Sequence, residues 1–70
     1  MIVTIEGNRL NFYSSFQYET AIVSIFNENN GWTESITDEK NFIILPLSSG
    51  NYIVEVYLID GRIFSGILHR

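Results

Sequence analysis

Three glycine-containing dipeptides divide this chain, and each stands between two short runs of β-prone residues. Gly7-Asn8, Asn30-Gly31 and Asp60-Gly61 are dipeptides that tight hairpin turns favour. The flanking runs alternate in hydrophobicity or are continuously apolar, and no helical period passes through them. Turn signals recur roughly every ten residues, a spacing that predicts an all-β fold of six or seven short antiparallel strands.

A chain of 70 residues offers one hydrophobic core, so the strands belong to one domain that spans residues 1–70. Two facing sheets fit strands of unequal length better than a closed barrel, which must satisfy strand number, tilt and shear together. The sequence therefore predicts a small β-sandwich. Its aromatic residues Phe12, Phe42 and Tyr52 are expected in the core, where a small domain needs large buried side chains.

The first hairpin follows from a two-residue turn at Gly7-Asn8. This turn pairs Val3 with Phe12 and Ile5 with Leu10, which gives one apolar face. It also sets Glu6 opposite Arg9 on the other face, where we expect an ion pair.

The second hairpin is predicted to join a strand over 20–26 to one over 32–37. A type I′ turn at Asn30-Gly31 would set Ile25 opposite Ile36. A further strand is expected over 42–47, with Pro46 at its exit from the sheet, and residues 48–51 are expected to turn the chain.

The last hairpin has two possible registers. A two-residue loop at Asp60-Gly61 pairs Leu58 with Ile63, and this is the register we expect. A three-residue loop with a bulge at the glycine would instead pair Tyr57 with Ile63 and move Phe64 to the core face. The choice decides which side chains of this hairpin face solvent.

The expected register predicts an interaction surface on the outward face of the last hairpin. Rigid aromatic side chains supply contact area at low entropic cost, and this face is unusually apolar for a solvated surface. Alternatively, these residues pack on the segment 16–18 as it crosses between the sheets. The candidate surface residues are Ile53, Tyr57, Phe64 and Leu68, with Trp32 as a further exposed aromatic.

Residues that carry chemistry are few and dispersed. His69 is the only imidazole, and its place near the chain end favours a packing role beside Tyr52 over catalysis. The carboxylates between Glu28 and Glu39 have no deep cleft to share in so small a domain. The Asn27 to Gly31 loop lacks the acidic ligands of a calcium loop. No catalytic residue, metal site or cofactor is predicted, and the chain is expected not to be an enzyme.

Net charge excludes one class of partner. Four Lys and Arg stand against eight Asp and Glu, which gives −4 and removes the attraction that phosphate backbones exert on basic surfaces. Nucleic-acid binding is therefore not expected.

No apolar run is long enough to span a membrane, and the first six residues lack the features of a secretory signal. The chain either stays inside the cell or is a mature domain.

Residues 42–66, with the element Leu47, Gly50 and Tyr52, resemble small immunoglobulin-like domains of unknown function that gut-dwelling Gram-negative bacteria export. Residues 5–10 and 22–31 resemble the first half of the same family. The Leu-x-x-Gly-x-Tyr element is also similar to the C-terminal sorting domains of the type-nine secretion route. The resemblance implies an immunoglobulin-like sandwich and a periplasmic, cell-surface or secreted location.

Two functions remain open at this point. The first is a non-enzymatic module that binds a protein partner or itself through a sheet face or an edge strand. The second is a carbohydrate-binding module with Trp32 and nearby tyrosines as a stacking platform, beside the amides of Asn29 and Asn30. Self-association predicts that the outward face of the last hairpin becomes dry across a symmetric contact.

Overall fold

The computed structural model describes residues 1–45 and 49–69, and these form seven strands with no helix. The strands are β1 (Ile2–Glu6), β2 (Arg9–Tyr13), β3 (Thr20–Phe26), β4 (Gly31–Thr37), β5 (Phe42–Ile44), β6 (Asn51–Leu58) and β7 (Ile63–His69). The all-β prediction is confirmed.

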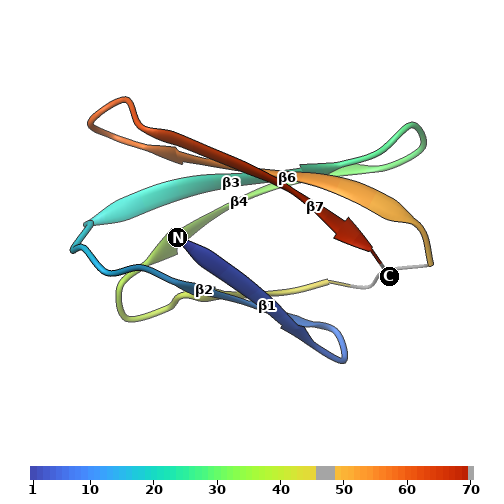
Figure 1. Cartoon of the computed structure of the whole chain (residues 1–70), viewed down its shortest axis with the longest axis horizontal. Helices are drawn as coiled ribbons and strands as arrows, with labels where there is room; N and C mark the ends of the chain where they lie inside the picture. The colour runs from blue at the N-terminus through green and yellow to red at the C-terminus, as the bar shows by residue number, and fades with distance from the viewer. Residues whose placement is uncertain (46–48, 70) are drawn as a thin grey trace.

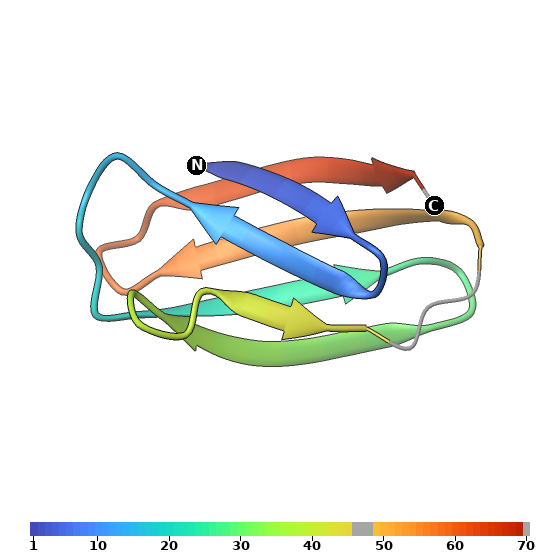
Figure 2. The same cartoon turned by 90° about the horizontal axis from the view of Figure 1, so that it is seen from below.

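Two sheets face each other and enclose the core (Figure 1). One has three strands in the order β1-β2-β5, and the other has four in the order β4-β3-β6-β7. Every pairing is antiparallel. The chain is thus a small β-sandwich, with its fourth strand on the same sheet as the third. Figure 2 shows β7 along one margin of the molecule, and β4 with β5 along the other.

The core lies between the inner faces of the two sheets. Its buried residues come from the five strands β2 to β6 and from the residue that follows β5. Alternation along each strand sends every second side chain inward. The buried hydrophobic residues are Leu10, Phe12, Ala21, Val23, Ile25, Ile36, Ile43, Leu45, Tyr52, Val54, Val56 and Leu58. Phe12 and Tyr52 are therefore core residues, as predicted.

Phe42 is not part of this buried core. It lies opposite Asn11 on the outer face of the three-stranded sheet and is only partly buried. The Arg9 guanidinium lies 4.0 Å from the centre of its ring, and the Lys40 ammonium lies 5.9 Å from it. The prediction for Phe42 is wrong because the β2–β5 register turns this ring outward, where cations cover it.

The first hairpin has the predicted register, with Ile5 opposite Leu10 and a positive φ of 59° at Gly7. The predicted ion pair between Glu6 and Arg9 is not formed. Arg9 instead donates from Nε to the Oδ1 atom of Asn11 at 2.9 Å and stacks on the ring described above. Both contacts are partly buried, whereas an exposed ion pair contributes little free energy.

The second hairpin differs from the prediction. Its loop is 27–30, with Asn27 N–H donating to the Asn30 carbonyl at 2.9 Å. The Asn27 side-chain oxygen accepts from the amides of Asn29 and Asn30 at 2.9 and 2.8 Å. Ile25 therefore pairs with Trp32, and Ile36 pairs with Ala21. The partner of Ile25 thus differs from the predicted one by four residues. Because an even shift keeps each side chain on the same face of the strand, Ile36 still lies in the core as predicted.

The last hairpin adopts the second of its two registers. Tyr57 pairs with Ile63, so the expected two-residue loop is wrong. Gly61 has a φ of 94° and donates to the Leu58 carbonyl at 3.0 Å, while Leu58 donates to the Arg62 carbonyl at 2.9 Å. These two bonds define a bulge with glycine at its first position. Asp60 supports it by accepting from the backbone and the guanidinium of Arg62 at 3.0 and 2.8 Å.

The strand predicted over 42–47 is shorter in the structure, since β5 ends at Ile44. Pro46, Leu47 and Ser48 lie outside the described residues, so the exit at Pro46 and part of the predicted 48–51 turn are not described. Gly50 has a φ of 148°, and the next residue, Asn51, begins β6.

Candidate interaction surface

The solvent-facing side of the four-stranded sheet carries two apolar rows that run across β3, β6 and β7. The strand registers place Ile22, Tyr57 and Ile63 in one row. They place Phe26, Ile53 and Ile67 in the other row. We call these six residues the outer apolar face.

The outer apolar face is largely accessible to solvent. Ile67 is 68% exposed and Ile63 is 58% exposed, while the face's central Ile53 is 43% exposed. A polar row of Ser24, Glu55 and Ser65 separates the two apolar rows. Solvated sheet faces usually alternate to polar residues, so a face with two exposed apolar rows is suited to contact with another molecule.

A side-chain hydrogen bond joins Tyr57, in the first apolar row, to Glu55, in the polar row. A hydrogen bond to the Glu55 carboxylate is the main cause that raises the pKa of Tyr57, followed by desolvation and the negative charge of Glu55. The phenol therefore stays protonated at neutral pH. It brings a polar atom to an apolar row, as interface tyrosines commonly do.

The second apolar row forms the floor of a shallow hollow of about 520 Å³ at one end of the sheet. Phe26, Ile53 and Ile67 line it together with polar residues that include Glu28, Asn51 and His69. His69 Nδ1 is 2.7 Å from the Asn51 side-chain oxygen. The imidazole thus pairs with Asn51 and not with Tyr52, so the prediction that it packs beside Tyr52 is wrong by one residue of register.

The structure divides the predicted surface residues between the two sides of the sheet. Ile53 and Tyr57 lie on the outer apolar face, as predicted. Phe64 and Leu68 face inward and pack against the core, as does the partly buried Trp32. Grouping the five on one surface is therefore wrong, because the bulge in the last hairpin shifts the strand by one residue and exchanges its faces.

Phe64 follows the alternative prediction, in which it packs on the crossing segment. Its ring stacks on Phe16 with the centroids 5.8 Å apart and the planes 19° apart. The Arg62 guanidinium lies 4.2 Å from the Phe16 ring centre. These contacts hold the start of β7 against the segment between β2 and β3.

Tyr18 lies in the same segment. Burial, followed by the charge of Asp38, raises the pKa of its phenol.

Trp32 does not present a stacking platform. Its indole meets the buried ring of Tyr52 edge-on, with centroids 5.9 Å apart and planes at 63°. The backbone N–H groups of Asn29 and Asn30 donate to the Asn27 side-chain oxygen within their own turn. The coplanar exposed aromatics that the carbohydrate hypothesis needs are therefore not assembled at Trp32.

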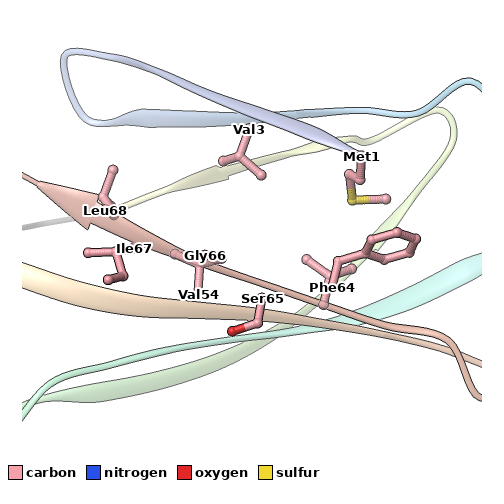
Figure 3. Close-up of a pocket in the computed structure, with 9 residues that line it drawn as sticks. Met1, Val3, Val54, Phe64, Ser65, Gly66, Ile67 and Leu68 are labelled. Carbon is pink, nitrogen blue, oxygen red and sulfur yellow. The ribbon is translucent and has the colours of Figure 1, made fainter.

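A second hollow, of about 250 Å³, opens where the two sheets part between β1 and β7 (Figure 3). Met1 and Val3 point into it from one side, and Phe64 and Leu68 line it from β7. Gly66 lies between those two residues and leaves the middle of β7 without a side chain. On the opposite margin β4 and β5 approach each other, so the β7 margin is the open one.

Within 1–45 and 49–69, no three His, Asp or Glu side chains converge in a way that could hold a metal ion. The same residues contain no helix that is long and apolar enough to cross a membrane. Among these residues, an ion pair joins Asp60 to Arg62 at 2.7 Å, and this contact lowers the pKa of the Asp60 carboxyl.

Sequence reasoning missed four members of the outer apolar face: Ile22, Phe26, Ile63 and Ile67. A signal for the first two was present, because the 20–26 run is apolar on both of its alternating faces and only one face can enter the core. The other two depend on the register of the last hairpin. Comparison with protein-family models, curated proteins and solved structures finds no match for this chain.

Proposed function

We propose that this domain is a non-enzymatic interaction module that binds a protein, either a partner or a second copy, through the four-stranded sheet. The observation that carries the proposal is the outer apolar face, with its two exposed rows on one sheet. A domain of this size needs its apolar residues to fold, so leaving large ones in water on a single face has a cost. Contact with another protein would recover it.

The composition of the face also fits a protein contact. Two apolar rows flank the polar row that contains Glu55, Tyr57 adds a hydrogen-bonding group, and Asn51 and His69 line the hollow at one end. Protein interfaces commonly combine apolar and aromatic side chains with hydrogen-bonding groups. An exported location, which the family resemblance implies, belongs to the same proposal, and fractionation of native cells would test it.

Site-specific photo-cross-linking in the native cell tests the proposal. A benzoylphenylalanine in place of Tyr57 puts a reactive ring on the outer apolar face. The matched control replaces Tyr13, which is 49% exposed on β2 of the other sheet. We expect a defined protein adduct at position 57 that Ile53→Asp abolishes, and none at position 13. Equal adducts at both positions, or none at position 57, would contradict the proposal.

A further inference from the structure

We propose that two copies of this chain associate by pairing their β7 strands antiparallel about a two-fold axis at Ser65. The four-stranded sheets would then join into one sheet of eight strands. This inference goes beyond the proposed function, because it places a second copy against the edge strand β7 and leaves the β3 and β6 part of the outer apolar face open to another protein. Three independent features of β7 support it: its free edge, the absence of charged side chains from Ile63 to Leu68, and Gly66.

The free edge of β7 exposes backbone groups that are ready for pairing. Leu58 donates to the Arg62 carbonyl, so this is a hydrogen-bonded pair of the β6–β7 ladder. Such pairs alternate along antiparallel strands, which makes Phe64, Gly66 and Leu68 the residues that bond to β6. The N–H and C=O groups of Ile63, Ser65 and Ile67 therefore point away from the sheet. All three residues are exposed.

This edge lacks the features by which sheet edges avoid pairing. Charged side chains, prolines and bulges within the strand commonly protect an edge, and the segment from Ile63 to Leu68 contains none of them. The other edge of the same sheet, β4, carries the exposed Glu34 near its centre. In a two-fold contact centred there, Glu34 would face its own copy. The edges of this sheet thus differ in their suitability for self-pairing.

The net charge of −4 favours β7 as the contact strand, because the segment from Ile63 to Leu68 has no charged side chain. A two-fold contact brings the residue on its axis against its own copy, so a carboxylate at that position would be repelled. Asp60, in the turn before β7, is already paired with Arg62. Glu55 is the carboxylate in the Ser65 row, and three strand spacings would separate it from its copy, about 14 Å. That distance exceeds the Debye length of about 8 Å at physiological salt.

An axis at Ser65 matches the side chains on the outer face. It sets Ile63 opposite Ile67 of the second copy, and Ser65 opposite Ser65, whose hydroxyls can bond across the axis. Each apolar row of one copy then continues into an apolar row of the other. Shifting the axis to Gly66 would set Ile63 opposite His69 and Ser65 opposite Ile67. The outer apolar face therefore favours the axis at Ser65.

Gly66 is explained by the same register. Its φ is not positive, and no atom lies within 4 Å of where a Cβ would stand, so nothing within the described chain requires a glycine there. Glycine inside a strand weakens it and often marks the close approach of another chain. With the axis at Ser65, Gly66 lies opposite Phe64 of the second copy in a closely spaced pair. The aromatic ring can cover the glycine on the inner face, beside the hollow of Figure 3.

The contact is small, which sets the expected strength. A standard interface buries about 800 Å² on each partner. That is about one sixth of the 4603 Å² that this chain exposes, and one strand edge supplies less. The association is therefore a concentration-dependent equilibrium between monomer and dimer.

Disulfide trapping tests the register in a chain that has no cysteine of its own. Ser65→Cys places two thiols opposite each other across the axis. The matched control is Ser35→Cys, an exposed serine on the other edge strand of the same sheet. Under mild oxidation we expect Ser65→Cys to form dimer roughly tenfold faster than the control, because pairing raises the effective thiol concentration. Equal rates would overturn the proposal.

A mixing experiment fixes the axis. Ile63→Cys mixed with Ile67→Cys should give more heterodimer than either variant gives homodimer. A preference for Ser65→Cys with Ile67→Cys would move the axis to Gly66 and overturn the proposal as stated. If trapping fails while position 57 still cross-links to a different protein, only the second copy is excluded. If both experiments fail, the proposed function fails as well.

Discussion

Replacing Gly66 with alanine should stabilise the monomer and weaken the dimer. The backbone at Gly66 is open to any residue, and a Cβ there would meet no atom within 4 Å. Alanine restricts the unfolded chain, which is worth about 0.4 to 1 kcal/mol at a site without strain. For a domain of this size, that gain raises the Tm by about 2 to 8 °C. In the dimer, the added methyl takes the space that Phe64 of the second copy would fill.

Circular dichroism melts at low micromolar concentration would measure the first effect, and sedimentation velocity at high concentration the second. The matched control is Gly61→Ala. Its φ of 94° is unfavourable for alanine, so this variant should lose more than about 1 kcal/mol. A destabilised Gly66→Ala monomer would refute the account of its backbone. An unweakened dimer would refute its role in the contact.

Three further outcomes follow from the contacts described. Asn27→Ala removes the acceptor of two loop amides and should cost about 1 kcal/mol, measured by urea denaturation; an unchanged midpoint would contradict this. Leu10→Ala leaves a cavity at a fully buried position and should lower the free energy of unfolding by about 2 to 5 kcal/mol. In so small a domain, that loss is enough to unfold much of the protein, which near-ultraviolet circular dichroism would show. A native spectrum and an unshifted melting curve would contradict this prediction. The contact with Arg62 lowers the pKa of Asp60, so this contact stabilises the fold above pH about 4 and ceases to do so as the pH falls through the lowered pKa. Asp60→Asn should therefore weaken the loss of stability in acid, measured as the free energy of unfolding against pH. An unchanged pH dependence would contradict the role of this contact.

The sandwich and its first hairpin could be predicted because local signals agree there. Gly7-Asn8 allows one tight turn, and only one register puts the apolar residues of both strands on the same face. The loop at 27–30 could not be predicted from the Asn30-Gly31 dipeptide. Asn27 closes that loop with its side chain and removes the need for a positive φ at Asn30.

The interaction surface was predicted only in part because it depends on one residue of register. Both registers of the last hairpin give faces with several apolar members, so hydrophobic alternation does not choose between them. The choice is made by the bulge at Gly61 and by Asp60, which holds Arg62. Ile53 and Tyr57 face outward in either register, whereas Phe64 and Leu68 change sides.

Sedimentation equilibrium over a concentration series tests most directly the claim that the sheet of β7 is a contact surface. It should be run on the wild type and on Ser65→Lys, which sets like charges against each other at the axis while leaving the bonds to β6 intact. We predict a mass that rises from monomer toward dimer for the wild type and stays monomeric for the variant. A wild type that remains monomeric at millimolar concentration, or a variant that associates equally well, would contradict the account.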